Sequence, residues 1–168
     1  QAESYYGLDF GVSSPTAVIE VKDDGNKTFY IREVLYTPMS SMGMPIHEYL
    51  QLPRGVERKP LIKPDCLVIC DSAKKTMVTD LAKGGLTAIP ALKGAGSISR
   101  TIGLVQSFKI VYTHSSSNLK SEYTEYSWKL DRYGLAEEIP ANNQQDHLLD
   151  ATGYIISYLV NFLGIGYV

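Results

Sequence analysis

Residues 5–11 read YYGLDFG, a short apolar stretch of β type that ends on a carboxylate, Asp9. An ionised Asp at the end of such a strand is costly to desolvate unless a positive group lies beside it. Two later segments repeat the arrangement: LVICD at residues 67–71, and the helical-looking DHLLD at residues 146–150. We therefore expect the fold to gather these acidic residues into one metal site.

Length and composition set the broad class. The chain has 168 residues, 44% of them hydrophobic, which is enough for one compact domain with a core. No apolar run approaches the roughly 20 residues that a membrane span needs, so we expect no membrane partner. The net charge of −2 excludes a simple polybasic nucleic-acid binder, but it fits a nucleic-acid enzyme whose acidic metal site offsets a basic groove.

The chain opens on Gln1 and enters a strand within a few residues. We therefore expect residues 1–168 to be a single domain taken from a longer polypeptide. Cys66 and Cys70 fall on one expected strand with their side chains on the same side, too far apart to form a disulfide. They are interpreted as small buried hydrophobes in a reducing, intracellular protein.

Turn and periodicity signals predict a mixed α/β domain. The chain begins with an antiparallel meander of three strands, and strands and helices alternate after it. Ser72 and Ser97 are expected helix caps. The expected strands are 5–10, 16–21, 28–36, 67–70, 86–90 and 109–113, and the expected helices start near Ile46, Ala73, Ile98, Asn118 and Asp146.

Asp9 and Asp71 each end an expected central strand, at the sheet edge where open α/β sheets bind ligands. If these strands are neighbours, the two carboxylates lie about one strand spacing apart, roughly 5 Å. A divalent cation between them would neutralise their repulsion. The alternative for either residue alone is a turn-initiating Asp, which is common at strand ends.

On the last helix, Asp146, His147 and Asp150 share one turn. Asp146 has a plain alternative role, since the helix dipole favours an acid in a first turn. Asp150 is expected where the helix packs on the sheet, and a carboxylate there needs a cation. His147 is a candidate ligand, proton shuttle or phosphate contact, with a surface histidine as the alternative. All-oxygen ligation suits Mg²⁺ or Mn²⁺, and two such ions about 3.5–4 Å apart promote phosphodiester hydrolysis.

The motifs resemble the nuclease domain of the large terminase subunit of tailed bacteriophages, which has a ribonuclease H-like fold. The likeness covers nearly the whole chain and keeps the motif order. One departure is Thr152-Gly153, where the family often has a larger residue, and we interpret it as a change in helix packing. The matching segments are GLDFG at 7–11, VICDSA at 68–73, KGAGSI at 93–98, EYTEYSW at 122–128 and DHLLDATGY at 146–154.

The resemblance implies a metal-dependent endonuclease that cuts concatemeric viral DNA during packaging in the host cell cytoplasm. It implies that Asp9, Asp71 and Asp150 bind the metal ions and that Asp146 and His147 assist them. It also implies a packaging ATPase earlier in the full-length chain, together with a portal and a small terminase subunit as partners. The expected DNA contacts, with little sequence preference, are Lys74, Lys75, Lys93, Arg100 and the loop 54–63.

Other functions compete with this hypothesis. Residues 7–14 are similar to the first phosphate loop of actin-like and sugar-kinase ATPases, but no second glycine-rich loop is present. A Holliday-junction resolvase or a transposase would share the fold and the metal chemistry. A DNA-docking module with a relic acidic cluster is a further alternative, against which stand three acidic motifs kept in order.

Overall fold

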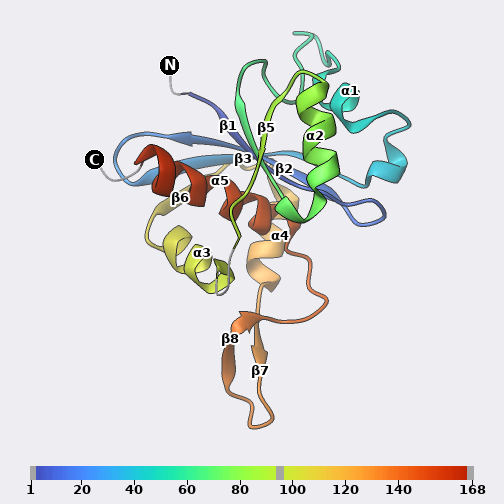
Figure 1. Cartoon of the computed structure of the whole chain (residues 1–168). Coiled ribbons are helices and arrows are strands. Elements are labelled where there is room, and N and C mark those ends of the chain that lie inside the picture. The colour runs from blue at the N-terminus through green and yellow to red at the C-terminus, as the bar shows by residue number, and fades with distance from the viewer. Residues whose placement is uncertain (1–2, 94–96, 166–168) are drawn as a thin grey trace.

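The computed structural model describes residues 3–93 and 97–165, and it shows one mixed sheet with helices on both faces (Figure 1). The sheet has the order β5-β4-β1-β2-β3-β6. Its strands are β1 Tyr5–Asp9, β2 Thr16–Asp23, β3 Thr28–Thr37, β4 Leu67–Cys70, β5 Thr87–Pro90 and β6 Lys109–Tyr112. The helices are α1 Ile46–Gln51, α2 Lys75–Lys83, α3 Ser97–Gln106, α4 Ser117–Glu125 and α5 His147–Leu163, with short 3₁₀ turns at Met39–Ser41 and Ser72–Lys74.

The strand directions confirm the predicted meander followed by parallel strands. β1, β2 and β3 pair antiparallel, whereas β4 lies parallel to β1, β5 parallel to β4 and β6 parallel to β3. The register pairs Leu8 with Cys70, and the Asp71 N–H donates to the Leu8 carbonyl at 2.9 Å. Asp9 and Asp71 therefore leave adjacent strands at the same edge, as the sequence predicted.

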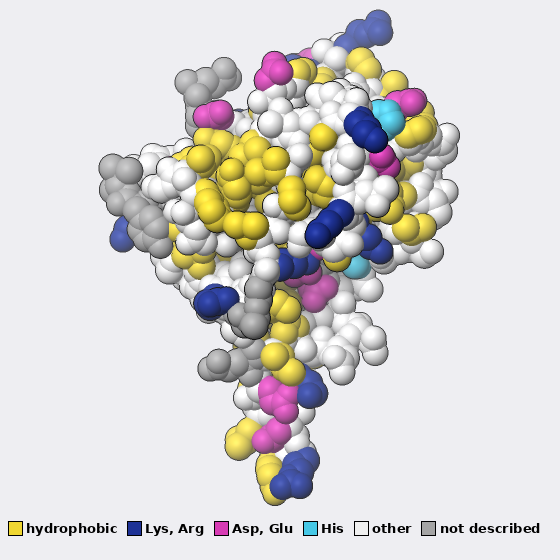
Figure 2. All heavy atoms as spheres, in the orientation of Figure 1, with side chains coloured by type: hydrophobic (Ala, Val, Ile, Leu, Met, Phe, Trp, Pro, Cys, Tyr) yellow, Lys and Arg dark blue, Asp and Glu magenta, His cyan; other side chains and the backbone are white. Residues whose placement is uncertain are grey.

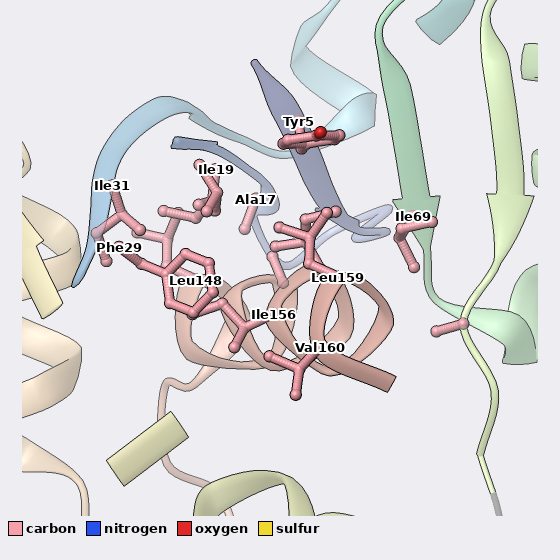
Figure 3. Close-up of a cluster of buried hydrophobic side chains, with 14 of the residues drawn as sticks. Tyr5, Ala17, Ile19, Phe29, Ile31, Ile69, Leu148, Ile156, Leu159 and Val160 are labelled. Atoms are coloured by element: carbon pink, nitrogen blue, oxygen red, sulfur yellow. The ribbon is translucent and has the colours of Figure 1, made fainter. Parts of the chain in front are cut away.

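The alternation of side chains along the central strands sends the two aspartates to one face. Tyr5 and Ile69 pack in the core between the sheet and α5, whereas Tyr6 and Leu8 pack with α1 and α2 on the other face. Since a strand has a period of two residues, Asp9 shares the face of Tyr5. Figure 3 shows Leu148 and Leu159 of α5 directed toward this first face, whereas Val160 of the same cluster points to the other side of the helix.

Gly7 allows α5 to lie directly on β1. A Cβ atom at this position would overlap the carbonyl oxygen of Ala151. Gly153 has a comparable role on the other side of α5, where a Cβ atom would crowd the Thr101 methyl group of α3. The Thr152-Gly153 pair, the expected site of altered packing, is thus a close approach between two helices.

Several elements differ from the sequence predictions. The helix expected from Asn118 to Trp128 ends at Glu125, because Tyr126 is extended and Trp128 starts a strand. That strand, β7 Trp128–Leu130, forms with β8 Ala136–Pro140 an unpredicted hairpin that projects from the domain (Figure 1). Its turn carried a signal, since the Asp131 carboxylate accepts from the N–H groups of Tyr133 and Leu135 and Gly134 has a positive φ.

Cys66 precedes β4 and Cys70 is its last residue. Cys66 is half-buried and Cys70 is buried in the same core cluster, and both are free thiols. Among the residues that the structure describes, no helix is both long and apolar enough to cross a membrane. The loop residues Gly94, Ala95 and Gly96 of the predicted glycine-rich loop lie outside the described residues.

Candidate active site

The candidate site lies at the edge where β1 and β4 end and where α5 begins. Asp9 and Asp71 are both buried, 8% and 7% exposed. The Asp71 carboxylate also accepts from the Ala73 N–H at 3.0 Å, so Asp71 caps the following turn. The prediction that Ser72 is the cap is therefore wrong. Asp71 has the turn-forming role that was the alternative for it, and it also lies beside Lys93 in the candidate site.

Each buried aspartate has one cationic or protonatable neighbour. His147 Nδ1 lies 2.9 Å from Asp9 Oδ2, and this hydrogen bond raises the pKa of His147. The Lys93 ammonium group lies 2.6 Å from Asp71 Oδ1 and donates to the Tyr154 hydroxyl at 2.9 Å. Lys93, expected to contact DNA, is thus part of the acidic cluster itself.

Asp150 faces the open side of the cluster. The prediction that it lies where α5 packs on the sheet is wrong: its neighbours Leu148 and Ala151 are buried, whereas Asp150 is solvent-accessible. It lines a groove of about 720 Å³ together with Lys93 and Tyr154. The surrounding protein, followed by the charges of Asp146 and Asp9, raises the pKa of Asp150 to about 7.

The charges of four aspartates act on the pKa of the Tyr154 hydroxyl. Burial raises the pKa of its hydroxyl, and the charges of Asp150, Asp9, Asp71 and Asp146 raise it further, in that order. Asp146 is half-buried, and its pKa is also raised, by burial and then by Asp9, against the opposing effect of His147. The contacts of the site join Asp9 with His147 and Asp71 with Lys93 and Tyr154, while Asp150 lines the same groove as Lys93 and Tyr154.

The side chains of the site offer carboxylate oxygens to a cation. Four carboxylates with too little positive charge around them are suited to Mg²⁺ or Mn²⁺, which prefer oxygen ligands. Within residues 3–93 and 97–165, however, no three His, Cys, Asp or Glu side chains already form a group that could hold an ion. The chemistry of the ligands fits, while Asp9 is engaged with His147 and Asp71 with Lys93.

The remaining residues predicted to contact DNA lie on the surface or at the other end of the strands. Lys74 and Lys75 are exposed directly after Asp71, and Arg100 is exposed on α3. The loop 54–63 lies toward the opposite edge, where Lys63 binds Glu20 and Ser4 beside the start of β1. Figure 2 shows basic, acidic and histidine side chains meeting in the middle of one face, between the body of the domain and the hairpin.

Two residues of the site were missed. Glu122, buried on α4, accepts from the backbone N–H groups of Leu148 and Leu149 at the start of α5. The Tyr154 hydroxyl accepts a hydrogen bond from the Lys93 ammonium group, whose nitrogen lies over the tyrosine ring, 4.6 Å from its centroid. Both fall inside segments quoted for the family resemblance, but a spacing pattern assigns them no contact.

The comparisons with known proteins agree at the level of fold. No protein-family model matches the sequence, and no curated protein matches it either. The structure is similar to the nuclease domain of the large terminase from bacteriophage SPP1 with bound Mn, with a TM-score of 0.73, 20% identity and coverage of 92% of this chain and 85% of that one. It is also similar to the P22 large terminase nuclease domain, with a TM-score of 0.57, 16% identity and coverage of 90% and 78%.

The fold also matches part of a longer protein. The large terminase of a thermophilic bacteriophage matches with a TM-score of 0.61 and 18% identity over 95% of this chain, which spans only 40% of that protein. These likenesses, together with the strand order, confirm the predicted fold class. The chain thus has the ribonuclease H-like fold of large terminase nuclease domains.

Proposed function

We propose that this protein is a metal-dependent DNA endonuclease that acts in phage genome packaging. One observation carries the proposal: the buried Asp9 and Asp71 end neighbouring strands beside the start of α5, where His147 bonds Asp9 and Asp150 lines a groove together with Lys93, the partner of Asp71. The fold of terminase nuclease domains supports the same function.

Asp9, Asp71 and Asp150 are the proposed ligands of Mg²⁺ or Mn²⁺, two ions in the active complex, with Asp146 as an auxiliary ligand. When bound, such ions activate water and offset the negative charge that develops during phosphodiester cleavage. His147 orients the Asp9 carboxylate through the 2.9 Å hydrogen bond. Lys93 holds the Asp71 carboxylate, and we propose that its ammonium group would serve as a contact for a DNA phosphate.

Further parts of the proposal concern partners. Double-stranded DNA is the substrate, bound with little sequence preference by Lys74, Lys75 and Arg100 beside the cluster. We also propose an ATPase region elsewhere in a longer chain, working with a portal and a small terminase subunit in the host cytoplasm; the 40% coverage of the longer phage protein supports only the presence of further chain. A Holliday-junction resolvase remains the second candidate because it would share the fold and the acidic cluster.

The experiment is cleavage of supercoiled plasmid by this domain with Mn²⁺ or Mg²⁺, compared with Asp71→Asn. We expect nicked and linear products with wild type and at least ~100-fold less product with the variant. Undiminished cutting by Asp71→Asn would contradict the metal site. Strong preference for four-way junctions over linear duplex would favour the resolvase, and ATP hydrolysis by the domain alone would favour a kinase-like ATPase.

A further inference from the structure

The N-cap position and the first turn of α5 carry three residues of the candidate site, yet the side chain at the N-cap position does not cap the helix. The opening N–H groups of a helix have no intrahelical acceptor, and a side chain at the N-cap position usually accepts from one of them. Asp146 occupies that position in α5 and makes no such bond. Its carboxylate is instead near Asp9 and His147.

Glu122 of α4 supplies the missing acceptor from another helix. Its Oε2 accepts from Leu148 N at 2.8 Å and from Leu149 N at 3.1 Å. The residue is only 2% exposed. Its other oxygen, Oε1, is buried without a hydrogen bond to the described residues. Burial raises the pKa of the Glu122 carboxyl group, against the opposing effects of the Leu149 N–H and the Tyr36 hydroxyl.

We propose that Glu122 is a positioning residue of the active site, which caps α5 from α4 and so leaves Asp146 available while fixing His147 and Asp150 opposite Asp9. A carboxylate at a helix N-terminus is favoured by the helix dipole as well as by hydrogen bonding. If Asp146 had to cap its own helix, its carboxylate would be committed to the backbone. The proposal extends the proposed nuclease function and rests on it for its catalytic consequence.

The molecule contains a matched control for this role. Glu33 of β3 caps α4 in the same manner: its Oε2 accepts from Asn118 N at 3.0 Å and from Leu119 N at 3.1 Å. The Asn118 side chain donates to Glu33 Oε1 at 2.6 Å. Because the first turn of α4 bears no residue of the candidate site, loss of the Glu33 cap removes a comparable interaction without moving a proposed ligand directly.

The experiment compares Glu122→Ala, Glu122→Gln and Glu33→Ala with wild type. One readout needs neither metal nor DNA: the imidazole NMR signals of His147, which are readily assigned because the chain has three histidines. We expect Glu122→Ala to shift these signals, as the hydrogen bond to Asp9 loosens, and Glu33→Ala to leave them unchanged. A lost cap with only a structural role would lower thermal stability in both variants and shift the His147 signals in neither.

The second readout is Mn²⁺ binding measured by calorimetry with the metal alone, followed by plasmid cleavage. Residues that orient metal ligands typically contribute about 10- to 100-fold to affinity or activity. We expect Glu122→Ala to lose about 10-fold or more in Mn²⁺ affinity and in kcat, with KM for DNA within about twofold of wild type. Glu122→Gln, which keeps an acceptor oxygen, should recover both to within about fivefold.

Unchanged His147 signals and Mn²⁺ affinity in folded Glu122→Ala would overturn the proposal, as would equal losses in Glu33→Ala. If Glu122→Ala does not fold, Glu122→Asp replaces it, because its shorter side chain retains the charge but not the reach to both N–H groups. Glu122→Asp with wild-type behaviour would then overturn the proposal. Wild-type protein that fails to cut DNA would contradict the proposed function, while the His147 comparison would still decide the role of Glu122.

Discussion

The two ends of the central strands each bury carboxylates, and they neutralise them to very different extents. At one end Glu20, 5% exposed, accepts from Lys63 Nζ at 2.8 Å and from Arg32 Nε at 2.9 Å. Burial alone would raise the pKa of Glu20, but the bonds from Lys63, Ser4 and Arg32 lower it to about 2. Glu20 is therefore fully compensated by the protein itself.

At the other end the balance is reversed. Among the described residues, Lys93 pairs with Asp71 and His147 with Asp9, while Asp150 and Asp146 lie near them. The pKa of Asp150 rises to about 7 because the surrounding protein and the charges of Asp146 and Asp9 outweigh the opposing effects of Lys93 and His147. A carboxylate that the protein neutralises serves stability, whereas a cluster left short of positive charge is a place for an external cation.

The largest effect is expected from removing one carboxylate of the acidic cluster. Asp150→Asn should lower plasmid cleavage in Mn²⁺ by about 1,000-fold, equivalent to ~4 kcal/mol of transition-state stabilisation. The same change should leave the melting temperature of the metal-free protein unchanged or higher, because it relieves repulsion with Asp146 and Asp9. Cleavage rates and thermal scans measure the two effects. A variant that cuts normally would remove Asp150 from the site.

Glu20→Ala should show the opposite pattern. Loss of this buried carboxylate is expected to lower the free energy of unfolding by about 2–3 kcal/mol, because Lys63 and Arg32 lose their partner. The loss is no larger because both cations stay partly exposed to water. The rate of cleavage at saturating Mn²⁺ should remain within about twofold of wild type. Urea unfolding and the cleavage assay test this pair of results. A large loss of activity in stable protein would break the proposed division between the two ends.

Divalent metal should stabilise wild type through the acidic cluster alone. A ligand that binds only the folded state at tenfold its Kd contributes about 1.4 kcal/mol. Mn²⁺ should therefore raise the melting temperature of wild type and of Glu20→Ala by a similar amount, and Asp150→Asn should lose most of this shift. An equal shift in Asp150→Asn would place Mn²⁺ elsewhere on the molecule.

The sequence predicted the sheet and the identity of the acidic residues for a physical reason. The residues that form β1 and β4 end on an aspartate, and the period of two residues places Asp9 and Asp71 on the face that α5 covers. Parallel neighbours then meet at one edge. Such patterns act along the chain, so they can be read without knowledge of the tertiary structure.

What the sequence did not predict depends on contacts between distant segments. Glu122 caps a helix that begins 25 residues later, and Lys93, which follows β5, binds Asp71, which follows β4. The sequence suggested that Asp150 lies on the buried face of α5, because its neighbours Leu148, Leu149 and Ala151 are apolar. Of these neighbours, only Leu148 and Ala151 are buried. Asp150 lines the groove instead. The groove is formed partly by α3 and β6, so the pattern along α5 alone does not reveal it.

The smallest effect is a pH dependence that differs in sign between the two ends. The pKa of Asp150 rises from an ordinary 3.8 to about 7, so the folded state holds a proton that the unfolded state has lost. The resulting stabilisation is present below about pH 4 and is lost as the pH rises through 7. The raised pKa values of Asp146 and His147 act in the same direction. Glu20 acts in the opposite direction, since its contribution is present above its ordinary 4.5 and is lost as the pH falls through about 2.

Between pH 5 and 8 the Glu20 contribution is therefore constant, and only the acidic cluster should be visible. We expect the melting temperature of metal-free wild type to fall by a few degrees over this range, on the scale of ~1 kcal/mol or less for a domain of this size. Asp150→Asn should show a shallower slope, and saturating Mn²⁺ should flatten or reverse the slope of wild type because the metal binds the deprotonated carboxylates. Parallel slopes in wild type and Asp150→Asn would show that Asp150 is ionised throughout, which would mean that Lys93 and His147 neutralise the cluster as completely as Lys63 and Arg32 neutralise Glu20.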